Sequence, residues 1–343
     1  MELINVALES PQVPTGAWLC PEDDPYPKGA PLITSVPDDD SPLAYNEDEM
    51  VFLWTQIYRI FLKIGYLRDE GVVFPPEDTG RHTAMDRARF QTEFNMSDRV
   101  ISLIERLPYP AEGAEGMDGT AFFPEGMILN YLNQDENVID ACRDPHPMFW
   151  YQRPTEGDPA EQGPARDYLL PDDVALLSPY ESDGMTWILD TKTNAIRTFW
   201  GVVDYTSRTI PDDFEDERPD DEDHYRNWPA YHAPFILKQY IRDLWNLKYV
   251  PERPGESILD SETTVRAALI AHVLRKDYGW PDAFRAEAWK EDSRKIMDAA
   301  FEMEEALVQR GYYHGLEIIK HWKKNPDQIP DIGTVTTGFN AEL

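Results

Sequence analysis

Apolar residues recur every three or four positions between residues 47 and 67, which is the spacing of a helix that buries one face. Gly65 fits the end of this helix, because glycine adopts the left-handed conformation of a C-cap at little cost. Ser97 is a suitable N-cap for a shorter helix over residues 98–107, which Pro108 would end. We expect the first helix to be buried, because its apolar stripe is wide and consists of Met50, Leu53, Trp54, Ile57, Ile60, Phe61 and Ile64.

Between residues 119 and 205 the pattern changes to short apolar runs divided by turns. Residues 187–190 and 196–200 are rich in β-branched and aromatic side chains, and they flank the polar residues 191–194. This arrangement predicts a β-hairpin.

Helical spacing returns after the strands, and it predicts long helices in residues 235–247, 260–277 and 281–322. Asp260 or Ser261 would cap the helix over residues 260–277. Helices, then strands, then helices predict an α+β fold, with a small, mostly antiparallel sheet flanked by N-terminal and C-terminal helices.

Three regions follow from this pattern. Residues 1–46 are rich in proline and acidic residues and lack a helical or strand period, so we expect an extended arm. Residues 47–250 would form the α+β core. Residues 251–343 would form a helical region packed on that core.

The composition makes several classes of protein function improbable for this sequence. The 343 residues are 41% hydrophobic, which is enough for a substantial core, and 64 acidic against 32 basic residues give a net charge of −32. This charge disfavours a broad DNA-binding surface. Two distant cysteines disfavour a zinc site or a disulfide framework, and no apolar run is long enough for a membrane span. We therefore expect a cytoplasmic protein without a metal or cofactor.

The densest charge lies in residues 211–223, PDDFEDERPDDED, which hold nine carboxylates and one arginine. Like charges at this density repel one another, so the segment is either a solvated loop or a site for a guanidinium or ammonium group. His224 follows directly, and neighbouring carboxylates would favour its protonated form.

Part of this run, Asp212-Asp213-Phe214-Glu215-Asp216, also matches the DDxx[DE] string of magnesium-dependent diphosphate enzymes. Prolines flank the string, and no long apolar helix adjoins it to enclose a hydrocarbon. A magnesium-dependent diphosphate enzyme is therefore a third possibility. The glycine-rich, GxSxG and HExxH signatures of nucleotide-binding proteins, serine hydrolases and zinc proteases are absent from the sequence.

Several short segments of the sequence are similar to segments of known groups of proteins. Over about residues 95–250 the chain resembles a large group of filamentous-fungal proteins and, more weakly, the arginine-containing cyclodipeptide synthases, which have an acidic DDxxE motif and use aminoacyl-tRNA. The matching segments are Leu107-Pro108-Tyr109-Pro110, Trp187-Ile188-Leu189-Asp190-Thr191-Lys192, Asp220-Asp221-Glu222-Asp223-His224-Tyr225-Arg226 and Tyr231-His232-Ala233-Pro234. If the motif begins at Asp220-Asp221, His224 stands where the family's pattern has glutamate, and if it begins at Asp212-Asp213, Asp216 stands there. The first placement fits the flanking residues and the second fits the carboxylate chemistry, so both stay open.

The resemblance implies an arginine-containing diketopiperazine synthase that takes arginyl-tRNA and needs no ATP. It implies catalytic roles for Asp220, Asp221 and His224. A substrate pocket would draw on Asp212, Asp213, Asp216, Glu222, Trp200 and Tyr205, because carboxylates pair bidentately with guanidinium.

A tRNA partner would need a local basic patch on this acidic chain. The candidates on the C-terminal helices are Arg266, Arg275, Lys276, Arg285, Lys290, Arg294, Lys295, Lys320, Lys323 and Lys324. The same residues are also placed to balance acidic neighbours on their own helices.

A second resemblance competes with the first. The hairpin around Leu189-Asp190-Thr191-Lys192, followed by an acidic loop and the helix FILKQYIRDL, is similar to the SUKH family of α+β interaction modules. This resemblance implies a protein-interaction function without catalysis, and the acidic loop would then be a linker.

Overall fold

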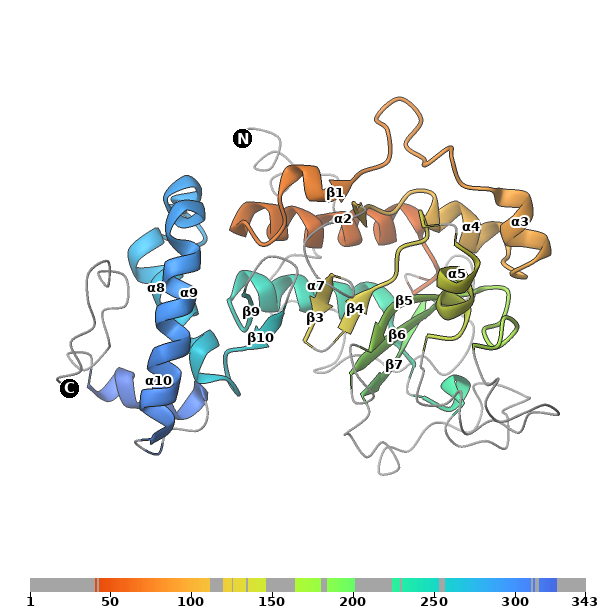
Figure 1. Ribbon diagram of the computed structural model, residues 1–343. Helices are drawn as coiled ribbons and strands as arrows, with labels where there is room; N and C mark the ends of the chain where they lie inside the picture. The colour runs from red at the N-terminus through yellow and green to blue at the C-terminus, as the bar shows by residue number, and fades with distance from the viewer. Residues whose placement is uncertain are drawn as a thin grey trace.

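The structure is a computed structural model (Figure 1). It describes residues 41, 43–111, 120–124, 126–133, 135–145, 164–179, 184–200, 224–228, 230–252, 257–309, 311 and 315–325. A six-stranded antiparallel sheet is flanked by helices from the N-terminal and C-terminal parts of the chain. The predicted α+β class is confirmed. No helix in these ranges is both long enough and apolar enough to cross a bilayer.

The N-terminal helices follow the predicted signals closely. Helix α2 spans Glu47–Ile64, and Gly65 ends it with a φ of 75°. Helix α4 spans Asp98–Ile104, and the Ser97 side chain accepts a hydrogen bond from a backbone N–H in its first turn, as an N-cap does. It ends three residues before the predicted Leu107. The short helix α3, Arg87–Thr92, was not predicted.

Two minor sheets accompany the main one. Strand β1 (Val72–Val73) pairs with β2 (Tyr109–Pro110), and β9 (Tyr249–Pro251) pairs with β10 (Ile258–Asp260).

The main sheet is a meander in which each strand pairs with the next. Its strands are β3 (Ala121–Phe123), β4 (Gly126–Ile128), β5 (Asp173–Pro179), β6 (Met185–Asp190), β7 (Ala195–Trp200) and β8 (Ala230–His232). Strands β6 and β7 form the predicted hairpin. Its turn is fixed by the Asp190 carboxylate, which accepts hydrogen bonds from the backbone N–H groups of Lys192 and Thr193. Helix α5 (Glu136–Arg143) lies between β4 and β5 in the chain.

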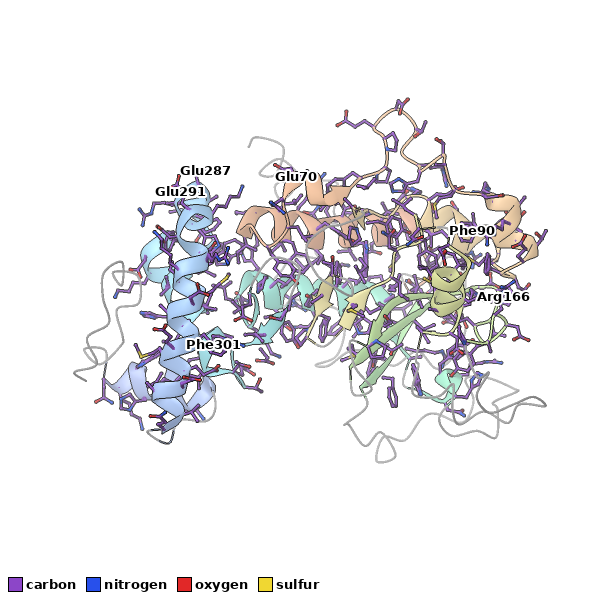
Figure 2. The ribbon with its side chains drawn as sticks, viewed as in Figure 1. Glu70, Phe90, Arg166, Glu287, Glu291 and Phe301 are labelled. Carbon is purple, nitrogen blue, oxygen red and sulfur yellow. The ribbon has the colours of Figure 1, made fainter. Side chains whose placement is uncertain are left out.

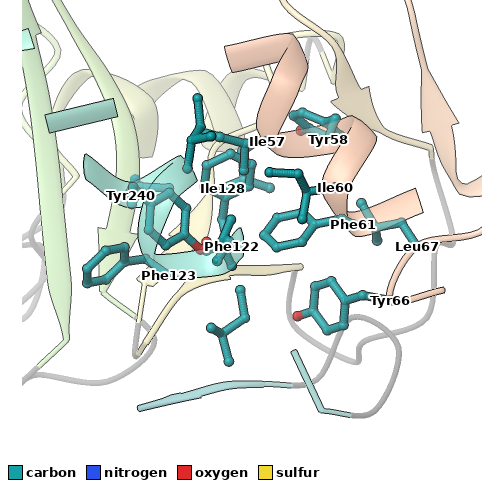
Figure 3. Close-up of a cluster of buried hydrophobic side chains, with 14 of the residues drawn as sticks. Ile57, Tyr58, Ile60, Phe61, Tyr66, Leu67, Phe122, Phe123, Ile128 and Tyr240 are labelled. Atoms are coloured by element: carbon teal, nitrogen blue, oxygen red, sulfur yellow. Dashed lines mark hydrogen bonds between the residues drawn. The ribbon is translucent and has the colours of Figure 1, made fainter. Parts of the chain in front are cut away.

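Helix α7 spans Ala233–Trp245 and begins directly after β8. It packs beside α2 and against the sheet (Figure 1). A core of aromatic and aliphatic side chains fills the space where α2, α7 and β3 meet (Figure 3). Phe122 of β3 is at its centre and stacks on Trp54 of α2, with ring centroids 4.4 Å apart. Burying one such side chain stabilises the fold by about 1.5–3 kcal/mol.

Three helices complete the fold: α8 (Val265–Tyr278), α9 (Ala286–Gln309) and α10 (Gly315–Lys324). They lie together at one end of the molecule (Figure 1). The predicted cap of α8 at Asp260 or Ser261 is wrong, because the helix begins after Thr264. The stretch 281–322, which was predicted as one long helix, contains two: all of α9 and most of α10. One buried cluster joins all three C-terminal helices to α2 and α7.

Candidate functional site

Most of the predicted acidic site lies outside the described residues. This is the case for Tyr205, Asp212, Asp213, Asp216, Asp220, Asp221 and Glu222, and also for the side chain of Trp200 at the end of β7. The structure therefore neither brings these residues together nor separates them. His224 is the one predicted site residue whose side chain is described.

His224 is half-buried and precedes a short 3₁₀ helix, η4 (Tyr225–Asn227). Its Nδ1 accepts a hydrogen bond from the backbone N–H of Arg226, at 3.3 Å. The imidazole ring contacts the rings of Tyr168 and Tyr225, each with centroids 4.8 Å away. The imidazole therefore has a defined position at the point where the chain leaves the acidic run.

Beneath His224 lies a buried network that sequence reasoning missed. The Tyr225 hydroxyl donates a hydrogen bond of 2.6 Å to the carboxylate of Asp173, at the start of β5. It also accepts one from the backbone N–H of Leu170. Asp173 is only 3% exposed, and burial, with the nearby Asp190 carboxylate, raises its pKa to about 7. The Tyr225 hydrogen bond and Arg197 and Arg143 oppose this rise.

Arg143, the last residue of α5, is fully buried beside this network. Its guanidinium donates hydrogen bonds to the backbone carbonyls of Leu169, Leu170 and Asp173. A buried guanidinium that satisfies loop carbonyls is a structural anchor, because it replaces hydrogen bonds that water would otherwise make. The network consequently fixes the segment before β5, on which η4 packs.

The described residues also form an open groove of about 620 Å³ at the start of α2. Its lining is polar and carries both signs of charge: Ser41, Ala44, Tyr45, Asn46, Glu47, Asp48, Glu49, Arg81, Ser102 and Arg106. The sequence did not predict this groove, because its two arginines are far from the α2 N-terminus along the chain.

The charged side chains of the groove form ion pairs and hydrogen bonds within it. Arg106 of the α4–β2 connection donates to Glu47, at 2.7 Å, and to Asp48, at 2.6 Å. Arg81 donates to the Ser102 hydroxyl and to Glu105. Asp48 nevertheless keeps 83% of its side chain exposed. The groove therefore offers fixed guanidinium groups and a carboxylate that reaches solvent.

The base of the groove is tied to the sheet. Asn194, in the β6–β7 turn, donates hydrogen bonds of 3.0 Å to the carbonyls of Leu43 and Ala44. Burial raises the pKa of the Tyr45 hydroxyl, and Glu47 adds to this effect. That hydroxyl is buried without a hydrogen-bond partner among the residues described.

The candidate basic residues have individual partners. Arg266 pairs with Glu252 at 3.0 Å, and Lys290 is near Glu287 at 3.5 Å. Arg275 and Arg285 donate hydrogen bonds to backbone carbonyls. These residues are distributed over α8, α9 and the link between them, whereas Lys320, Lys323 and Lys324 are on α10.

Metal ligands do not gather in the part of the chain that the structure describes: no group of three or more His, Cys, Asp or Glu side chains is placed to hold an ion there. Burial instead favours the neutral form of two buried side chains, His232 and Cys142. Burial lowers the pKa of His232 to about 4 and raises that of Cys142 to about 12.

Comparisons with known proteins do not add a family to this picture. No family model, no curated protein and no solved structure matches the chain. The function is therefore inferred from the geometry above and from the two resemblances.

Proposed function

We propose that this chain is a protein-interaction module, and that it binds a polypeptide partner at the groove beside the α2 N-terminus. The observation that carries the proposal is the open polar lining of this groove, which presents charges of both signs. Mixed, fixed charges suit a partner surface that carries complementary charges, because they select orientation and register.

The fold agrees with this reading. The SUKH resemblance rests on a hairpin, an acidic loop and an aromatic helix in that order. The β6–β7 hairpin precedes α7 in the chain, and the acidic residues 211–223 lie between them in the sequence. The turn of the hairpin supports the groove through Asn194. The resemblance and the groove therefore involve the same end of the sheet.

A pair of charge reversals tests the proposal. Asp48→Lys reverses an exposed groove carboxylate, whereas Glu291→Lys makes the same change on α9, at the far end of the molecule (Figure 2). Partners would be cross-linked to the full chain in native extract, identified, and titrated as purified proteins. We expect Glu291→Lys to bind as the wild type does and Asp48→Lys to bind about tenfold more weakly, the effect of a misplaced interface charge. Equal affinities for both variants would refute the groove as the docking site.

A second candidate function is arginine-containing cyclodipeptide synthesis, which the fixed position of His224 beside the acidic run favours. In this reaction the α-amine of one aminoacyl group attacks the ester carbonyl of another and releases tRNA. The α-amine of the transferred aminoacyl group then attacks the remaining ester carbonyl, which closes the ring and releases the second tRNA. A carboxylate of Asp220 or Asp221, or the His224 imidazole, would accept the amine proton. The basic residues of α8–α10 would meet the tRNA.

Mass spectrometry separates the two candidates. The chain would be expressed in a host with its own charged tRNAs, and extracts would be searched for arginine-containing diketopiperazines. A product that is absent with empty vector and with the Asp220→Ala/Asp221→Ala variant supports the synthase. Absence of product from folded protein favours the interaction module. The magnesium-dependent diphosphate reading through Asp212, Asp213 and Asp216 stays a prediction.

A further inference from the structure

A lysine of α2 lies over two indole rings that contact each other, where the N-terminal and C-terminal parts of the fold meet. The Lys63 ammonium is 4.6 Å from the ring centroid of Trp245 and 5.4 Å from that of Trp280. Trp245 ends α7, and Trp280 follows α8. An ammonium group on aromatic faces is attracted by the ring quadrupoles, most strongly by tryptophan.

Hydrogen bonding contributes little to this contact. An ammonium group carries three donors. Lys63 has one hydrogen bond among the described residues, a long one of 3.5 Å to the carbonyl of Pro281. Burial lowers the pKa of Lys63, and Asp282 partly offsets that effect. The site thus binds the charge through its aromatic walls and offers few acceptors for N–H groups. A methylated ammonium matches such a site, because it keeps the charge and has fewer donors to satisfy.

The walls do not depend on Lys63 for their position. The Trp280 indole N–H donates a hydrogen bond of 2.8 Å to the carbonyl of Trp245. Phe284 packs edge-on against Trp280, with centroids 5.0 Å apart, and Trp280 is only 4% exposed. Lys63 is half-buried, and its flexible stem allows it to leave the site.

We propose that Trp245 and Trp280 form a binding site for a methylated ammonium group, and that Lys63 occupies this site as an internal competitor. The site is separate from the groove and does not depend on the proposed function. A tethered ligand acts at an effective concentration of about millimolar. An external ligand therefore binds well only when Lys63 is displaced or removed.

The test uses full-length protein with tetramethylammonium as the probe. Binding would be followed by NMR of the indole N–H groups, with the Trp280 signal assigned from Trp280→Phe. We expect Lys63→Ala to bind the probe at least about tenfold more tightly than the wild type, because the tethered competitor is gone. Lys63→Gln keeps most of the side chain without the charge, so its affinity for the probe should lie between those of the wild type and Lys63→Ala. It replaces Lys63→Ala in the test if the alanine variant does not fold.

Two controls make the result specific. Lys192→Ala removes an exposed lysine of the β6–β7 turn, and it should leave the weak binding of the wild type unchanged. The double variant Lys63→Ala/Trp245→Leu lacks one of the two indole rings, so it should not bind the probe more tightly than the wild type does. The proposal is overturned if folded Lys63→Ala and Lys63→Gln bind tetramethylammonium no better than the wild type. It is also overturned if plain ammonium binds as tightly as the methylated probe.

Discussion

Replacing Asp173 by asparagine should remove a pH-dependent weakness of the native state. The Asp173 side chain is 3% exposed and accepts a hydrogen bond from the Tyr225 hydroxyl. Asparagine is nearly isosteric and keeps a carbonyl oxygen for that hydrogen bond, but it cannot ionise. The substitution therefore separates the charge from the packing.

The magnitude follows from the raised pKa. Burial moves the pKa of Asp173 from 3.8 to about 7, so the native state binds the proton more tightly than the unfolded chain does. Stability is then lost as the pH rises from 3.8 to about 7, at about 1.4 kcal/mol per pH unit. Between about pH 5 and about pH 8 the wild type should lose about 2.5 kcal/mol relative to Asp173→Asn.

Urea unfolding at several pH values measures this difference. His82 and His272, whose pKa values burial lowers, act with the opposite sign, because their contribution is lost as the pH falls. They are present in both proteins, so the difference between the two proteins cancels them. Asp172→Asn is the matched control, because it changes a neighbouring carboxylate that pairs with Lys192. It should not remove the loss of stability with rising pH. A difference between wild type and Asp173→Asn that does not change with pH would refute the reasoning.

Two further substitutions test contacts elsewhere. Gly315→Ala would place a Cβ against the backbone carbonyls of Ser261 and Thr264, so we expect it to lower stability by about 1–3 kcal/mol and to expose α10 to limited proteolysis. An unchanged cleavage pattern would show that α10 does not dock as described. Glu105→Gln weakens hydrogen bonds from Arg81 and Arg87, both partly exposed, and we expect a loss of about 1–2 kcal/mol in urea unfolding, smaller at high salt. A loss that does not depend on salt would contradict the electrostatic explanation.

Local signals predicted those parts of the fold that local interactions determine. Gly65 ends α2 and Ser97 caps α4, because each needs only its own backbone neighbours. The β6–β7 hairpin is likewise a contact between adjacent segments. Helix α5 was missed because it is short, and the buried anchor Arg143 satisfies carbonyls about 30 residues away, a contact that no local pattern encodes.

The same distinction between local and long-range contacts applies to the candidate sites. The acidic run was visible because its residues are adjacent in sequence. The groove was not, because Arg81 and Arg106 reach the start of α2 only through folding. The aromatic site of Lys63 was also not visible, since its parts come from three separate segments. Composition showed that the chain contains many tryptophans, but it did not indicate which of them face a cation.

The α8 N-terminus shows how tertiary structure overrides a capping signal. Asp260 has a side chain suited to an N-cap, but its carboxylate accepts a hydrogen bond from the backbone N–H of Glu262 and forms a turn instead. The helix therefore begins later, after Thr264, whose side chain makes no capping hydrogen bond. The Glu304 carboxylate of α9 accepts the backbone N–H of Arg266 in its place, at 2.9 Å. An N–H group of the first turn of α8 is thus satisfied by a residue of α9 that is 38 positions away in the chain.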